Sequence, residues 1–203
     1  MVQILPVLFG LVLMLGGCGE TPDNTPLAGD IEGIGIEANA TRILATEQAA
    51  VEATVYYTLD VPDRNVTENV EWTSSNTSIA TVSADGIVSG AGEGGVVSIK
   101  AEYKRFDAST DIEVIALRSL EIVADDANLS QERYVPLRCE GTFEDESRRD
   151  VTGAVTWLLV ASGESNASID ANGTLYTGDA NGSIVVRAER FDVNTTRTFT
   201  VTP

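Results

Sequence analysis

The sequence contains an internal repeat with two copies. Four matches carry the repeat: Trp72 with Trp157, Asp85-Gly86 with Asn172-Gly173, Ala101-Glu102 with Ala188-Glu189, and Arg105-Phe106-Asp107 with Arg190-Phe191-Asp192. The first and last matches are 85 residues apart, and the two between them are 87 apart. The spacings predict a two-residue insertion after the second Trp and a two-residue deletion before the second Arg-Phe-Asp. A duplication of this size favours two copies of one small domain.

Each copy has the alternation of strands with one buried face. The apolar positions are Val51, Ala53, Val55, Tyr57 and Leu59 in the first copy, and Val135, Leu137, Cys139, Gly141 and Phe143 in the second. Asp-Gly and Asn-Gly between short apolar runs are typical of hairpins with type I′ turns, in which both central residues have positive φ. No long segment has a helical period, so the predicted fold class is all-β.

The N-terminus carries a different signal. Residues 4 to 17 form an apolar run, which is shorter than the roughly 20 residues of a membrane-spanning helix. Such a run is typical of a signal peptide, although no Lys or Arg precedes it. It ends in Leu15-Gly16-Gly17-Cys18, which resembles the lipobox of bacterial lipoproteins. The resemblance implies that residues 1–17 are a signal peptide and that Cys18 carries acyl chains such as palmitate, which anchor the chain to a membrane.

Residues 18–30 contain two Pro and no apolar periodicity, so we expect a lipidated Cys followed by a flexible tether. A tether of this length has an r.m.s. reach of about 20 Å. Gly19 rather than Asp follows Cys18. In Gram-negative lipoproteins this resembles the pattern sent to the outer membrane, so the expected location is the bacterial cell envelope, in the outer membrane if the cell is Gram-negative.

The segment WTSSNTSIATVSADGIVSG, residues 72–90, is similar to the core signature of the group-2 bacterial immunoglobulin-like domain. This small β-sandwich occurs in adhesins, in intimin- and invasin-like proteins and in phage structural proteins. The resemblance implies two tandem Ig-like β-sandwiches, one over residues 31–117 and a looser match over 118–203. The junction between them, DIEVIALRSLEIVAD, contains neither Gly nor Pro, so we expect a stiff two-domain rod.

Charge and residue types exclude several functions. The chain has 31 acidic and 13 basic residues and a net charge of −18, which repels nucleic acid. It has no His, the commonest general base and metal ligand, and no P-loop or paired-Cys motif. The acidic stretches 141–150 and 168–175 lack the order of a calcium loop. We therefore expect no enzyme, no cofactor and no metal site; an enzyme would require a deep pocket lined by at least two carboxylates.

The candidate binding residues are Arg105, Phe106, Arg190 and Phe191, at the turn before the last strand of each copy. Continued alternation would turn both Phe rings outward, where an aromatic ring beside Arg is a plausible contact anchor. Alternatively the strand ends first and each ring covers the rim of its own sandwich. Exposure would favour recognition, and burial would favour a spacer.

Two further residues have structural interpretations. Trp72 is expected to fill the core of its domain rather than to bind a ligand. Cys139 lies on the apolar alternation, which favours an inert core thiol over a reactive one.

These observations predict a non-catalytic lipoprotein of the cell envelope. Its Ig-like domains would act as a binding or adhesion module toward protein or carbohydrate at the cell surface. The alternative is a structural spacer or assembly subunit with no ligand of its own.

Overall fold

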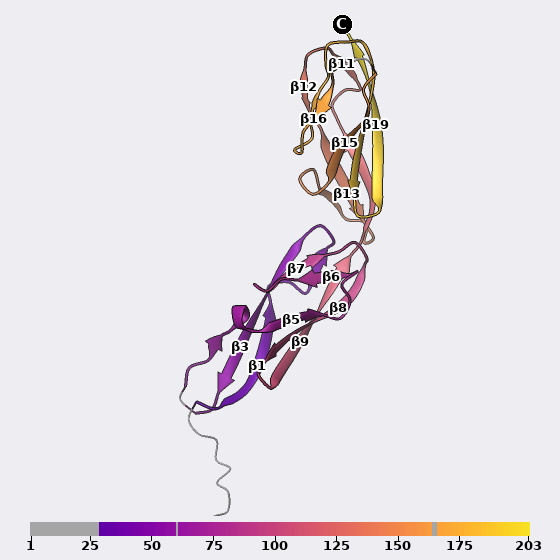
Figure 1. The fold of residues 1–203 in the computed structure, drawn as a ribbon. Coiled ribbons are helices and arrows are strands. Elements are labelled where there is room, and N and C mark those ends of the chain that lie inside the picture. Colours follow the sequence, from indigo (N-terminus) through magenta and orange to yellow (C-terminus); the bar gives the residue numbers. More distant parts are fainter. Residues whose placement is uncertain (1–28, 60, 164–165) are drawn as a thin grey trace, which may run out of the picture.

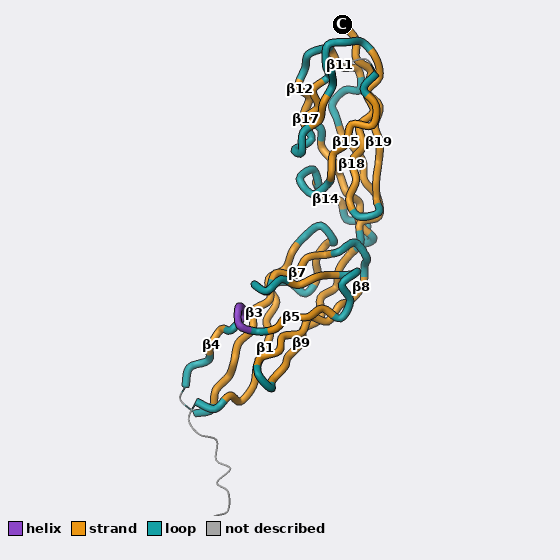
Figure 2. The backbone as a smooth tube through the Cα atoms, in the orientation of Figure 1, coloured by secondary structure: helices purple, strands orange, loops and turns teal. Residues whose placement is uncertain are grey.

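A computed structural model describes residues 29–59, 61–163 and 166–203, and Figures 1 and 2 show that these residues form strands and turns. The regular helix among them is one turn of 3-10 helix, η1 (Thr67–Asn69). In the described part of the chain no helix is long and apolar enough to cross a bilayer. The predicted all-β class is confirmed.

The N-terminal half builds two facing sheets. Its strands are β1 (Ile31–Ala38), β2 (Arg42–Leu44), β3 (Gln48–Tyr57), β4 (Arg64–Asn65), β5 (Glu71–Ser74), β6 (Ala80–Val82), β7 (Ile87–Gly90), β8 (Gly95–Tyr103) and β9 (Phe106–Ile115). One sheet has the order β1-β3-β7-β6, with β4 also paired to β3, and the other has the order β2-β9-β8-β5.

The C-terminal half repeats this arrangement. Its strands are β10 (Leu117–Val123), β11 (Asn128–Ser130), β12 (Tyr134–Pro136), β13 (Arg138–Phe143), β14 (Arg148–Asp150), β15 (Thr156–Ala161), β16 (Ser168–Ile169), β17 (Thr174–Tyr176), β18 (Gly182–Arg190) and β19 (Val193–Thr202). The sheet β11-β19-β18-β15 corresponds to β2-β9-β8-β5. The strand that matches β3 is interrupted at Leu137, so the facing layer consists of β10-β13-β14 and β12-β17-β16.

An early strand of each half runs parallel to the last strand of the same half. β2 pairs with β9 through residues 42–44 and 113–115, and β11 pairs with β19 through residues 128–130 and 200–202. The other strand pairs are antiparallel, and in β8–β9 and β18–β19 the short turn between consecutive strands requires this direction.

The inward residues of the two sheets meet in the core of each half. The predicted apolar positions Val51, Val55, Cys139 and Phe143 are buried. Trp157 is also buried, and Trp72 is half-buried against the first-half core. The indole Nε1 of Trp72 donates to the carbonyl of Thr67 at 3.0 Å, as that of Trp157 does to Thr152 at 3.1 Å. Trp72 therefore has the predicted packing role.

Two local predictions were wrong. Leu59 is 72% exposed and has a φ of 59°, because β3 ends at Tyr57 and the chain turns before the alternation reaches Leu59. The Asp-Gly and Asn-Gly turns do close hairpins, but only their glycines, Gly86 and Gly173, have positive φ. The amide of Gly86 donates to the carbonyl of Ser83. The amide of Ser83 donates to the carbonyl of Ile87 in β7, so a loop of three residues separates the two. This loop is longer than a type I′ turn and needs only one left-handed residue.

The two halves lie end to end, and the chain passes between them without a loop (Figure 1). β9 ends at Ile115 and β10 begins at Leu117. Leu44 and Ile115 of the first half belong to the same buried cluster as Leu117 and the second-half core.

Candidate binding surfaces

The predicted site residues lie in two β-hairpins, while Cys18 lies outside the described residues. Arg105 and Phe106 belong to the β8–β9 hairpin, and Arg190 and Phe191 belong to the β18–β19 hairpin. In both, the Arg guanidinium stands over the neighbouring Phe ring, 5.0 Å from the centroid for Arg105 and 4.5 Å for Arg190.

The two Arg-Phe-Asp tripeptides are not structurally equivalent. Phe106 is the first residue of β9 and pairs with Tyr103, whereas Phe191 lies in the turn itself, between the paired residues Arg190 and Val193. Ala101 pairs with Ala108 and Ala188 pairs with Thr195, so the spacing of 87 continues through both hairpins. The predicted two-residue deletion is therefore wrong. The residue that corresponds to Phe191 is Lys104, and both have positive φ, 52° and 56°.

Phe191 packs at the junction between the halves. Its ring is half-buried and contacts the apolar clusters of both halves. A Cβ atom at Gly92, in the loop between β7 and β8, would lie 3.1 Å from its Cγ and Cδ1 atoms. The same junction contains a pocket of about 390 Å³ lined by Gly92, Leu117 and Phe191 among others. Phe191 thus bridges two sandwiches rather than covering the rim of its own.

Phe106 lies at the opposite end of the first half. It is half-buried and lines a pocket of about 350 Å³ together with Gly29, Asp30, Ile31, Lys104 and Arg105. These residues form the end of the half that adjoins the N-terminal segment. Arg105 and Phe106 therefore lie at the end of the first half that is away from the junction, apart from Arg190 and Phe191.

Polar contacts also join the halves. Nη2 of Arg42 donates to Oδ2 of Asp145 at 3.1 Å, and the amide of Glu144 donates to the carbonyl of Ala116 at 3.0 Å. The hydrogen bonds that Ser147 donates hold the pKa of Asp145 below its ordinary value, and the nearby Arg42 charge adds to this. The junction thus combines an apolar contact with an ion pair.

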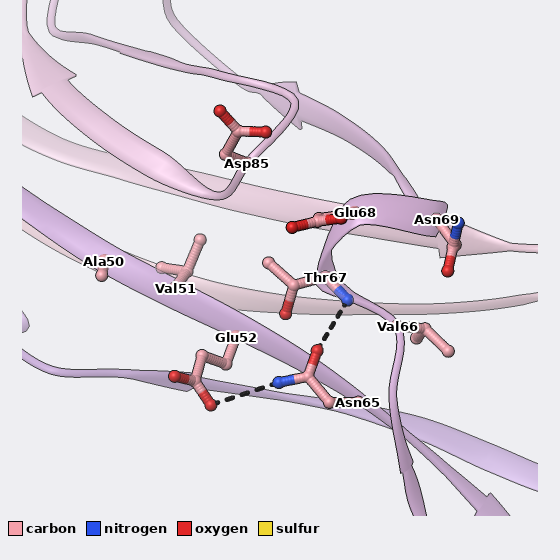
Figure 3. Close-up of a pocket in the computed structure, with 9 residues that line it drawn as sticks. All are labelled: Ala50, Val51, Glu52, Asn65, Val66, Thr67, Glu68, Asn69 and Asp85. Atoms are coloured by element: carbon pink, nitrogen blue, oxygen red, sulfur yellow. Dashed lines mark hydrogen bonds between the residues drawn. The ribbon is translucent and has the colours of Figure 1, made fainter.

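A third pocket, of about 300 Å³, lies beside η1 in the first half (Figure 3). Its walls carry three carboxylates, Glu52, Glu68 and Asp85, and all three are exposed to solvent. Asn65 ties one wall together, since its Oδ1 accepts from the Thr67 amide at 3.0 Å and its Nδ2 donates to Glu52 at 3.4 Å. Carboxyl catalysis of glycoside hydrolysis needs an acid shielded from water. This pocket is an acidic groove on the surface beside η1.

Among the described residues, no group of three or more His, Cys, Asp or Glu side chains could hold a metal ion. Cys139 is 0% exposed. Burial raises the pKa of its thiol to about 11. Both observations fit an inert core thiol, since the thiolate is the reactive form.

One surface feature was missed from the sequence. On the sheet β12-β17-β16, Tyr134 pairs with Tyr176, and Tyr176 pairs with Ser168. The two Tyr rings lie 5.0 Å apart between centroids, with planes tilted by 35°. Tyr134 is 75% exposed. The three residues form a row across the outer face of the sheet, which we call the tyrosine row.

Residues 43–112 match the bacterial Ig-like domain (group 2) family. Together with the paired sheets, this match assigns the fold as an Ig-like β-sandwich. Ice-binding protein 1 of Shewanella frigidimarina (strain NCIMB 400) is 29% identical over 139 residues, which cover 68% of this chain. The chain spans 15% of the length of that relative.

Similar solved structures include domains 5–6 of the S-layer protein SbsC, with 18% identity, a TM-score of 0.37 and coverage of 85% of this chain and 98% of that one. The Yersinia pseudotuberculosis adhesin InvE gives 16% identity, a TM-score of 0.37 and coverage of 85% of this chain and 60% of that one.

Proposed function

We propose that the chain is a non-catalytic binding module of the bacterial cell envelope, in which two Ig-like units form one stiff arm. The carrying observation is the packed junction, where Phe191 lies against Gly92 and Leu44 and Ile115 join the second-half core. A junction that buries apolar side chains resists bending, whereas a flexible linker would let the units swing. A stiff arm keeps its two ends at a fixed distance, so a surface on the far half is held away from the tether.

The arm is held at the membrane through Cys18 in this proposal. Residues 1–17 act as the signal peptide, residues 18–30 act as the tether, and the two units cover 31–117 and 118–203. The lipobox resemblance of Leu15-Gly16-Gly17-Cys18 supports the anchor. Several acyl chains would bury dozens of methylenes at about 0.8 kcal/mol each, enough for stable anchorage. The location would be the outer membrane in a Gram-negative cell.

Fractionation of cells that express the full chain tests the anchor. Cys18→Ser should move the protein from the membrane to the soluble fraction and remove the mass of the acyl chains, and globomycin should block processing. Cys139→Ser is the matched control, because its thiol is buried; this variant should stay in the membrane fraction. Unchanged mass and partitioning of the Cys18→Ser variant would rule the anchor out.

We assign a binding role to the surface of the two Ig-like units. The family match and the relation to a protein named for ice binding support it, since that relative takes its name from a surface that it binds. Cells that display the chain should adhere to an immobilised ligand surface more strongly than cells that carry the Cys18→Ser variant. Equal adhesion would favour the second candidate function, a structural spacer without a ligand.

The second candidate is a structural spacer without a ligand. The position of Phe191 favours it, because one of the two aromatic rings expected to recognise a ligand packs between the halves instead. A spacer should tolerate replacement of every exposed side chain without loss of function, provided that its length and stiffness are kept.

A further inference from the structure

The outer face of the sheet β12-β17-β16 differs from its counterpart in the first half. The inward row Val135–Leu175–Ile169 corresponds to Ala49–Val88–Val82, and both rows are apolar. The tyrosine row, Tyr134–Tyr176–Ser168, corresponds to Gln48–Ser89–Thr81. In the first half Nε2 of Gln48 donates to Oγ of Ser89 at 3.0 Å. The same scaffold therefore forms with a polar outer row, and the fold does not require the two tyrosines.

The backbone that presents Tyr134 is held in place. Oγ1 of the fully buried Thr177 accepts from the amide of Arg133 at 3.0 Å and donates to the carbonyl of Ser130 at 2.9 Å. The amide of Glu132 donates to the carbonyl of Gly178 at 2.7 Å. The exposed ring therefore stands on a fixed strand, which lowers the entropy cost of binding.

Polar groups lie beside Tyr176 in the sheet and in the adjoining loops. Ser168 continues the row with a hydroxyl group, and Nδ2 of Asn166 donates to Oδ2 of Asp179 at 3.1 Å in the loops beside β16 and β17. Tyrosine itself combines a large apolar ring with a hydroxyl group. The outer face of the sheet thus offers flat aromatic rings and a polar edge. A sugar ring presents matching groups, with C–H groups on its faces and hydroxyl groups around its edge.

Charge selects among possible occupants. The chain carries a net charge of −18, so an anionic polymer or a second copy of the chain would approach against repulsion. A neutral polysaccharide carries no such penalty.

We propose that the tyrosine row is a binding site for a neutral polysaccharide, whose sugar rings stack on Tyr134 and Tyr176. This assignment deepens the proposed binding function and rests on it. Ser168 and the Asn166–Asp179 pair accept and donate hydrogen bonds at the edge of the stacked sugars.

The test uses the full chain purified in detergent, with an array of neutral and anionic glycans and titration calorimetry on defined hexasaccharides such as cellohexaose, chitohexaose and hexagalacturonate. The double variant Tyr134→Gln/Tyr176→Ser copies the first-half row and should keep the thermal stability of the wild type. We expect the wild type to bind at least one neutral glycan, and the double variant to bind it at least about tenfold more weakly, as expected when aromatic anchors are lost.

Gln48→Ala changes the corresponding row of the first half and should leave the affinity unchanged. The proposal is overturned if no neutral glycan binds, if only anionic glycans bind, or if the double variant binds as well as the wild type. Self-association of the wild type that the double variant loses, measured by sedimentation, would assign the row to a second copy instead. Because purified protein is used, these outcomes are independent of the Cys18→Ser fractionation: glycan binding without anchorage would keep the site and remove the envelope location.

Discussion

The ring of Phe191 occupies the space that a side chain at Gly92 would need, since a Cβ atom there would lie 3.1 Å from Cγ and Cδ1 of the ring. The glycine has a φ of 120°, a conformation that other residues rarely adopt. A residue of one half thus fits into a gap in the backbone surface of the other half. This fit makes the relative position of the halves testable by mutation.

Phe191→Ala should loosen the junction. The variant removes the ring that contacts both apolar clusters, and for a half-buried ring we expect a loss of about 1–2 kcal/mol in the free energy of unfolding. Small-angle scattering should report a wider distribution of angles between the halves. Phe106→Ala is the control, because Phe106 lies at the end of the first half away from the junction; equal scattering from all three proteins would contradict a junction held by Phe191.

Trp157→Phe should destabilise the second half. Trp157 is 7% exposed and donates to the Thr152 carbonyl at 3.1 Å, so the variant loses one buried hydrogen bond and part of the packing, about 1–3 kcal/mol. The remaining Trp72 then reports unfolding of the first half by fluorescence, while circular dichroism reports both halves. Trp72→Phe removes the same bond from a more exposed site and should cost less; a larger loss from Trp72→Phe would be inconsistent with this packing.

The Cys139 thiol should be inert in the folded protein and should make stability depend on alkaline pH. Burial raises its pKa to about 11, above the ordinary value of about 8.5. A raised folded-state pKa of a thiol favours the protonated form, so the stability is complete below about pH 8.5 and falls as the pH rises toward 11.

In a Cys18→Ser background, a thiol reagent at pH 8 should react at the rate of unfolding. Denaturant titrations of this protein and of the Cys139→Ala variant should diverge in pH dependence between about pH 8.5 and 11. Rapid labelling of the native protein would show that the thiol is accessible.

The ion pair at the junction should weaken in acid. Hydrogen bonds from Ser147 and the nearby Arg42 charge lower the pKa of Asp145 from its ordinary value of 3.8. A lowered folded-state pKa contributes stability above the ordinary value, and this contribution is lost as the pH falls through the folded pKa.

Fluorescence energy transfer between dyes on the two halves should therefore change below about pH 4 in the wild type. Asp145→Asn should give the acid-type value already at neutral pH. Asp150→Asn is the control, because the pKa of Asp150 is also lowered, chiefly by Thr152, but its hydrogen-bond partner is in its own half. An identical response in the two variants would show that the acid-induced change does not arise from the ion pair at the junction.

The sequence predicts the class and the buried faces because alternation needs only local information. Val51 and Val55, and likewise Cys139 and Phe143, lie four residues apart in one strand and are buried together whatever their strand partners are. The absence of Gly and Pro near Leu117 likewise predicted the direct passage from β9 to β10, because no residue there favours a loop.

The hairpin register could not be predicted from the repeated tripeptide. Alignment of the identical tripeptides equates Phe106 with Phe191. However, the nine residue pairs of each hairpin keep Ala101 and Ala188 facing the core, and this pairing fixes the position of the turn. Slipping a strand to match the tripeptides would disrupt the pairing on which the buried face depends. The tyrosine row was missed for a related reason: Tyr134 and Tyr176 are 42 residues apart, and only strand pairing makes them neighbours.

The parallel pairing of β2 with β9 and of β11 with β19 determines how the chain would respond to tension. A pull on the two ends of one half draws the paired strands past each other along their own axes. The three residue pairs of each contact must then yield together instead of separating one at a time from an open end. We expect single-molecule stretching to give two force peaks, one for each half, and a lower peak for the half in which proline replaces Glu113 or Thr200, whose amides donate to the carbonyls of Thr41 and Ala127 at these parallel contacts. An unaltered peak would place the mechanical resistance elsewhere. An arm built this way would hold its length under drag.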